Sequence, residues 1–111
     1  MQFTQWRRSA LSAVFIALVW GSGALGEIEA ARDLMEEGKF TEARTALWPA
    51  ARSGNAEAEE LIGVMYAMGL GVEQDYQRAF EWYLRSAMKG HPGAQSGVGW
   101  YYEVGLGMPA I

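Results

Sequence analysis

The sequence predicts an all-α protein, an α/α solenoid of stacked antiparallel helix pairs in which the last repeat is incomplete. Three observations lead to this prediction. The chain repeats with a period of 36 residues, each period contains two segments with apolar residues at helical spacing, and glycines end those segments. No segment shows the alternation of apolar and polar residues that is typical of a β-strand.

The composition limits the functions that this chain can have. Its 111 residues suit one small domain, and its 50% apolar and 20% charged residues suit a folded chain. The absence of cysteine excludes disulfides, thiolate metal sites and a cysteine nucleophile, and a single histidine excludes a multi-histidine metal site. We therefore expect no cofactor and no metal. A net charge of −4 without a basic cluster in the sequence argues against a nucleic-acid partner.

Residues 1–26 have the order of a secretory signal peptide. Arg7 and Arg8 precede an apolar stretch, Ala10 to Trp20, and small residues follow it. Cleavage after Ala24 and cleavage after Gly26 both fit. A membrane anchor is the alternative, but the apolar stretch of about 11 residues is short of the ~20 needed to span a bilayer. We expect a periplasmic or secreted protein that has no membrane contact after cleavage.

Residues 27–54 are predicted to form an opening helix pair. The first helix, Glu27–Glu37, ends at Gly38, and the second, Thr41–Ser53, ends at Gly54. Pro49 lies inside the second helix and should bend it one turn earlier.

Residues 55–90 are predicted to form one complete repeat. Its first helix, Glu57–Met68, stops at the glycines of Gly69–Gly71, which allow a turn with positive φ. Asp75 can cap the second helix, Tyr76–Lys89, and Gly90 suits the left-handed position that follows. Small residues in both helices, with Gly63 the clearest case, predict a close approach between helices, and the aromatic residues should fill the grooves. On the outer side, an ion pair between Glu81 and Arg85 is expected.

Residues 91–111 contain the first half of a second repeat. A shift of 36 aligns Asn55–Val72 with His91–Met108 and gives six identical pairs. The helix from His91 to about Val104 and its glycine turn are present, and the sequence holds no second helix after them. We therefore expect residues 94–108 either to self-associate in a dimer or to fray, unless the chain is part of a longer repeat protein.

The residues of the complete repeat resemble the Sel-one-like repeat (SLR) family, relatives of the tetratricopeptide repeats. The match over 55–90 departs from the family pattern only at Ile62 and Ser86, and 91–108 match the first half of another repeat. Residues 27–54 look like a shorter opening unit with a tetratricopeptide-like turn. The matching positions are Ala58, Gly63, Tyr66, Gly69, Gly71, Val72, Asp75, Ala79, Trp82, Tyr83, Ala87 and Gly90. The resemblance implies a solenoid that acts by holding other proteins, often in the bacterial envelope.

Three features have the residue types of catalytic or phosphate sites, and each has a simpler explanation. A helix rather than a strand precedes Gly69-Leu70-Gly71, so these glycines are interpreted as a turn. His91 has no serine coupled to it in the sequence and is interpreted as a solvated turn residue. The acids Glu57, Glu59 and Glu60 begin a helix, where the helix dipole favours negative charge.

A candidate partner-binding strip follows from the helical spacing. Leu61, Val64 and Met68 lie at i, i+3 and i+7, and the corresponding positions of the next repeat include Trp100 and Val104. Such a strip suits a partner helix or peptide. The alternative for Trp100 is packing in the core or against a following repeat, and Tyr102 is expected to take the packing position of Tyr66.

The sequence thus predicts an exported, non-catalytic scaffold or adaptor that binds another protein or peptide on a concave, helix-lined face. One alternative is an exported hydrolase acting on cell-wall material, although no set of residues supplies its nucleophile or metal. The other is a truncated fragment of a longer repeat protein without a function of its own.

Overall fold

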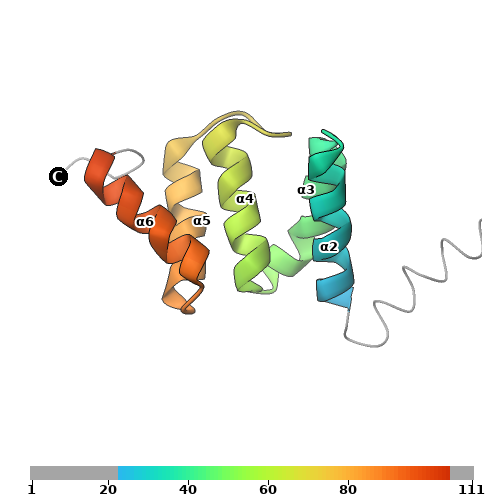
Figure 1. Cartoon of the computed structure of the whole chain (residues 1–111), viewed down its shortest axis with the longest axis horizontal. Helices are drawn as coiled ribbons and strands as arrows, with labels where there is room; N and C mark the ends of the chain where they lie inside the picture. Colours follow the sequence, from blue (N-terminus) through green and yellow to red (C-terminus); the bar gives the residue numbers. More distant parts are fainter. Residues whose placement is uncertain (1–22, 106–111) are drawn as a thin grey trace, which may run out of the picture.

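The computed structural model describes residues 23–105 and confirms the all-α prediction for this range. Five helices follow one another, and each packs against the next along the chain (Figure 1). They are α2 (Gly23–Glu36), α3 (Phe40–Arg52), α4 (Ala56–Met68), α5 (Tyr76–Met88) and α6 (Pro92–Val104). None of these described helices is long and apolar enough to cross a membrane.

The opening pair consists of α2 and α3. Helix α2 begins at Gly23, four residues before the expected start, and residues 1–22, with most of the expected signal peptide, lie outside the described residues. Ile28 of α2 is buried, and it packs into the same core as Leu47 of α3. Pro49 lies inside α3, which continues to Arg52.

The ends of α4 and α5 are formed by the residues that the sequence indicates. The side chain of Asp75 accepts a hydrogen bond of 3.0 Å from the backbone nitrogen of Arg78, as predicted, and Asn55 does the same for Ala58 of α4. Gly69 ends α4 with a φ of 70°, in the left-handed region. These local signals define where each helix begins and ends. The packing between helices depends instead on which side chains meet.

The ring of Tyr83 on α5 fills the space between α4 and α6. A Cβ added at Gly63 of α4 would lie 3.3 Å from this ring, and one at Gly97 of α6 would lie 3.2 Å from it. The close approach predicted at Gly63 is therefore confirmed, and Tyr83 is the side chain that requires it. Burial raises the pKa of the Tyr83 phenol to about 12.

Helix α6 buries a different aromatic residue from the one expected. Tyr101 is 2% exposed and its ring centroid lies 5.7 Å from that of Tyr83. Tyr102 is 57% exposed, whereas Tyr66 at the equivalent repeat position is 9% exposed, so the expectation that both share a packing role was wrong. The reason is the neighbouring helix: α5 covers the side of α6 that carries Tyr101, whereas Tyr102 lies at its border, in an edge contact with Phe80.

The expected ion pair between Glu81 and Arg85 does not form in the described structure. The guanidinium of Arg85 lies instead over the ring of Trp82, 4.6 Å from its centroid. Stacking on an aromatic face holds an arginine side chain in place without a carboxylate partner. On the outer surface of α5, the positive charge of Arg85 is therefore not neutralised by a carboxylate within residues 23–105.

Candidate partner-binding surfaces

The five residues of the predicted strip lie on two helices that both pack against α5. Leu61, Val64 and Met68 belong to α4, and Trp100 and Val104 belong to α6. The two helices meet near their first turns, where Glu60 contacts His91. Figure 1 shows that the last turn of α6 leans away from α4. The strip therefore has a segment on each helix, and the two segments diverge toward the ends where Met68 and Val104 lie.

Exposure differs along the strip. Leu61 and Val64 are half-buried, and Leu61 packs against the core. Met68 is 65% exposed, Trp100 49% and Val104 47%. The Trp100 ring meets the edge of Tyr101, with 5.2 Å between ring centroids. Trp100 is therefore not part of the core formed by residues 23–105, because about half of this side chain faces solvent.

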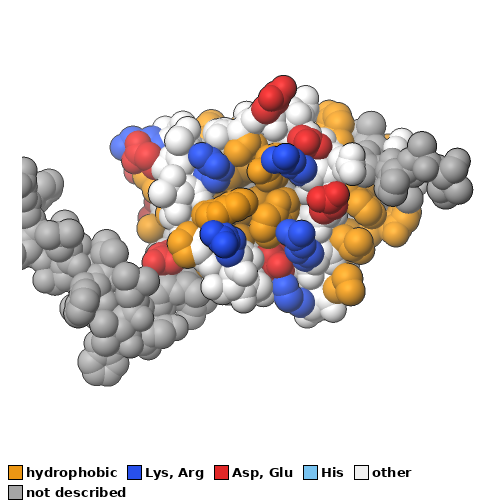
Figure 2. Space-filling model, turned by 180° about the vertical axis from the view of Figure 1, so that it is seen from behind, with side chains coloured by type: hydrophobic (Ala, Val, Ile, Leu, Met, Phe, Trp, Pro, Cys, Tyr) orange, Lys and Arg blue, Asp and Glu red, His pale blue; other side chains and the backbone are white. Residues whose placement is uncertain are grey.

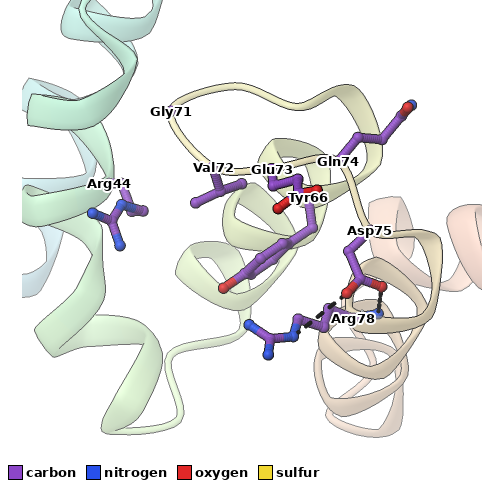
Figure 3. Close-up of a pocket in the computed structure, with 8 residues that line it drawn as sticks. All are labelled: Arg44, Tyr66, Gly71, Val72, Glu73, Gln74, Asp75 and Arg78. Carbon is purple, nitrogen blue, oxygen red and sulfur yellow. Dashed lines mark hydrogen bonds and ion pairs between the residues drawn. The ribbon is translucent and has the colours of Figure 1, made fainter.

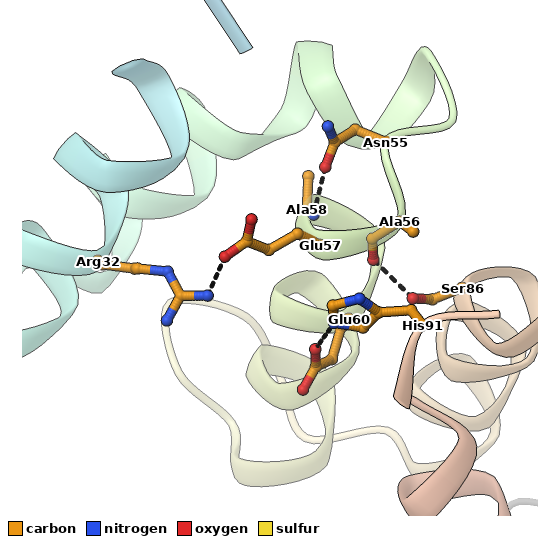
Figure 4. A network of polar contacts seen from close by, with 8 residues as sticks. All are labelled: Arg32, Asn55, Ala56, Glu57, Ala58, Glu60, Ser86 and His91. Atoms are coloured by element: carbon orange, nitrogen blue, oxygen red, sulfur yellow. Dashed lines mark hydrogen bonds and ion pairs between the residues drawn. The ribbon is translucent and has the colours of Figure 1, made fainter. Parts of the chain in front are cut away.

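The three acids at the start of α4 connect this helix to its neighbours, and Figure 4 shows two of them, Glu57 and Glu60. Glu57 pairs with Arg32 of α2, and Glu59, which is buried, accepts a 2.6 Å hydrogen bond from the ammonium of Lys89. Beside them, the hydroxyl of Ser86 donates a 2.6 Å bond to the carbonyl oxygen of Ala56. The helix dipole alone does not account for acids with such partners, so their main role is to join α4 to its neighbours.

His91 is a structural contact rather than a free turn residue. It is the residue just before α6, it is half-buried, and its Nε2 lies against the carboxylate of Glu60 (Figure 4). Within residues 23–105, Glu60 is the one carboxylate that contacts it. No group of acids and histidines in this range could hold a metal ion. His91 therefore links α6 to α4, which corrects the sequence interpretation.

A cavity of about 510 Å³ lies between α3, α5 and the loop that joins α4 to α5. Its walls are Arg44 of α3, Tyr66 of α4, Arg78 of α5 and residues 71–75 of the loop (Figure 3). Arg78 lies over the Tyr66 ring, 5.7 Å from its centroid, and its Nε is 3.5 Å from a carboxylate oxygen of Asp75. The Nε of Arg44 is buried and has no hydrogen-bond partner among residues 23–105.

A second cavity, of about 210 Å³, shares Arg44 with the first and is otherwise lined by Thr45, Trp48 and Pro49. Trp48 meets Trp82 of α5 edge to face, with 5.7 Å between ring centroids. Figure 2 shows the side of the molecule turned away from the viewer in Figure 1, where Lys and Arg side chains surround an apolar patch. We call Arg44, Trp48, Arg78, Trp82 and Arg85 the arginine–tryptophan face.

The sequence analysis missed this face although a signal for it exists. Arg44 and Trp48 are four residues apart, and so are Arg78 and Trp82. Each pair therefore shares one side of its own helix. The basic residues are not clustered along the sequence, and the structure gathers them by placing α3 next to α5.

These features define a class, the helical-repeat proteins, in which stacked helix pairs present exposed surfaces to partners. The Sel1 repeat family matches the chain at residues 56–91 and 92–110. The chain belongs to this family of tetratricopeptide-like repeat proteins, which are protein-interaction scaffolds.

A solved structure and two curated proteins are similar to this chain. The crystal structure of a Sel1 repeat protein from Oxalobacter formigenes is 36% identical, covers 73% of this chain and 33% of its own chain, and superposes with a TM-score of 0.69. From Arabidopsis thaliana, HRD3A and HRD3B, each an ERAD-associated E3 ubiquitin-protein ligase component, are 39% and 36% identical over 67 residues. These 67 residues are 60% of this chain and only 10% and 11% of the two plant proteins.

Proposed function

We propose that this chain is an exported, non-catalytic scaffold or adaptor that holds another protein or peptide on the strip formed by Leu61, Val64, Met68, Trp100 and Val104. The exposure of Trp100 carries the proposal. A large aromatic side chain that half faces solvent on a packed helix is a typical centre of a binding surface. Because packed helices already hold the strip in place, binding a partner costs little free energy for ordering the strip.

Export is supported by the order of residues in 1–26 and is compatible with the fold. Both cleavage positions precede Ile28, so processing would keep the buried contacts between α2 and α3. The mature protein should begin at Leu25 or Glu27. Intact-mass measurement on periplasmic or secreted material tests this, and recovery of the unprocessed 12.2 kDa species from membranes would contradict it.

Partner binding through the strip is tested with Trp100→Ala in a pull-down from an envelope fraction. For the partner that the parent protein captures, we expect the free energy of binding to weaken by about 2 kcal/mol or more. Met88→Ala is the matched control, because Met88 is 79% exposed on α5, outside the strip. Far-ultraviolet circular dichroism should stay unchanged in both variants. Equal capture by Trp100→Ala and its parent would refute the proposed site.

A second candidate is self-association through residues 94–108. It is favoured by the contrast between two equivalent glycines. At Gly63 a neighbouring ring lies against the helix, whereas an added Cβ at Gly99 would meet nothing within 4 Å, and Tyr102 beside it is exposed. A second copy of α6 could cover this side. Sedimentation should then show a dimer that Tyr102→Ser weakens. A monomer with strong amide protection across residues 94–104 would refute this candidate; residues 106–108 lie outside the described range.

A further inference from the structure

The arginine–tryptophan face carries positive charge that the chain does not neutralise itself. Among the described residues, four basic side chains have carboxylate partners: Arg32, Lys39, Arg78 and Lys89. Arg44, Arg52 and Arg85 have none in this range, and two of these three, Arg44 and Arg85, belong to the face. A chain with a net charge of −4 thus presents a local positive surface, which favours an acidic partner at this position.

The larger cavity has the donors that a carboxylate needs. The Arg78 guanidinium and the Tyr66 hydroxyl point toward α3, and Arg44 of α3 lines the same cavity (Figure 3). A guanidinium presents several N–H donors in one plane and binds a carboxylate through two parallel hydrogen bonds. The Arg44 side chain forms no salt bridge within residues 23–105, so a carboxylate placed in this cavity would not have to displace an internal acid from it.

The smaller cavity has room for an apolar group directly beside that carboxylate. Arg44 lines both cavities, and Trp48 and Pro49 give the smaller one an apolar wall. Trp48 is held in place by its edge contact with Trp82, which in turn lies under Arg85. A ligand that carries a carboxylate next to an apolar side chain would fill both cavities at once.

The acids at the rim of the larger cavity restrict the choice of ligand. Glu73 and Asp75 line it together with the two arginines. Glu73 and Asp75 repel every negative charge brought beside them, so they oppose a run of phosphates more strongly than a single carboxylate placed next to Arg44. An acidic segment of a protein is therefore the partner whose chemistry fits this face.

We propose that the arginine–tryptophan face binds an acidic peptide segment of a partner protein, with a carboxylate between Arg44 and Arg78 and a neighbouring apolar side chain against Trp48. This inference rests on the proposed function, in that the chain binds other proteins, but it places the contact on a different surface. Trp100→Ala should therefore leave it intact, so failure of either surface can be recognised separately.

The test is selection of random twelve-residue peptides on the full chain, followed by affinity measurement with a synthetic copy of a selected peptide. We expect the selected peptides to carry an acidic residue next to an apolar one. Arg44→Gln and Arg78→Gln should each weaken binding by about tenfold or more. Arg32→Gln removes the same charge from an exposed site on α2, outside the face, and should change binding less than twofold.

Two further measurements make the result decisive. Arg44→Gln should melt close to the parent, because within residues 23–105 the Arg44 side chain forms no salt bridge and its Nε has no hydrogen-bond partner. Loss of binding with an unchanged melting temperature then reports on recognition. Three results would overturn the proposal: selection that enriches no acidic peptide, equal binding by Arg44→Gln and Arg32→Gln, or binding of a single-stranded oligonucleotide that the acidic peptide does not displace.

Discussion

Replacing Gly71 with alanine should destabilise the protein more than any other glycine-to-alanine change in the α4–α5 loop. Gly71 has a φ of 69°, in the region that alanine adopts at a cost of about 1–2 kcal/mol. In addition, an added Cβ would lie 2.8 Å from the carbonyl carbon and oxygen of Phe40 and 2.9 Å from the nitrogen of Thr41. These are backbone atoms at the start of α3, so no side-chain rotation can relieve the contact.

The magnitude follows from these two effects. Overpacking against a fixed neighbour costs about 1–3 kcal/mol, and with the conformational term the total is about 2–5 kcal/mol. Gly69→Ala is the matched control, since Gly69 has nearly the same φ, 70°, while its added Cβ would meet Gln74 at an ordinary 3.4 Å. It should lose only the conformational term of about 1–2 kcal/mol. The difference between the two variants measures how closely the loop approaches α3.

Urea unfolding followed by far-ultraviolet circular dichroism gives both free energies of unfolding. The urea concentration at the unfolding midpoint should fall in both variants, and it should fall further in Gly71→Ala. The slope of the free energy of unfolding against urea concentration should stay unchanged. Equal losses in the two variants would show that the loop does not contact α3 as described. The larger cavity would then lose one of its walls, because residues 71–75 form that wall.

Three further predictions concern the interior. Gly63→Leu should lower the free energy of unfolding by about 1–3 kcal/mol, because the ring of Tyr83 occupies the space the leucine needs; an unchanged melting temperature would contradict this. The pKa of Tyr83 is raised to about 12 in the folded chain, whereas a tyrosine in the unfolded chain has a pKa of about 10. As the pH rises between these two values, the unfolded chain releases the proton first, so the free energy of unfolding should fall. This fall should be less steep in Tyr83→Phe. Lys89→Met should cost about 1–3 kcal/mol in urea unfolding by leaving the buried Glu59 without its partner.

The sequence by itself determined the helices and the repeat. Apolar spacing and local signals such as Asp75 and Gly69 depend on residues within a few positions, so they can be interpreted without knowing the fold. Gly63 could be singled out for the same reason, because glycine in the middle of a helix is unfavourable unless another group must come close. Which group comes close, the Tyr83 ring, was not predictable from the glycine alone.

Only the tertiary structure decided what each exposed side chain meets. Tyr101 and Tyr102 are adjacent and chemically identical, yet one is buried and the other exposed, because α5 covers only one side of α6. Likewise, Arg44 and Arg78 are 34 residues apart in the sequence and come to line one cavity because α3 and the start of α5 enclose it with the loop. Helical periodicity assigns a residue to a side of its helix, and the neighbouring helices determine whether that side becomes core, ion pair or binding surface.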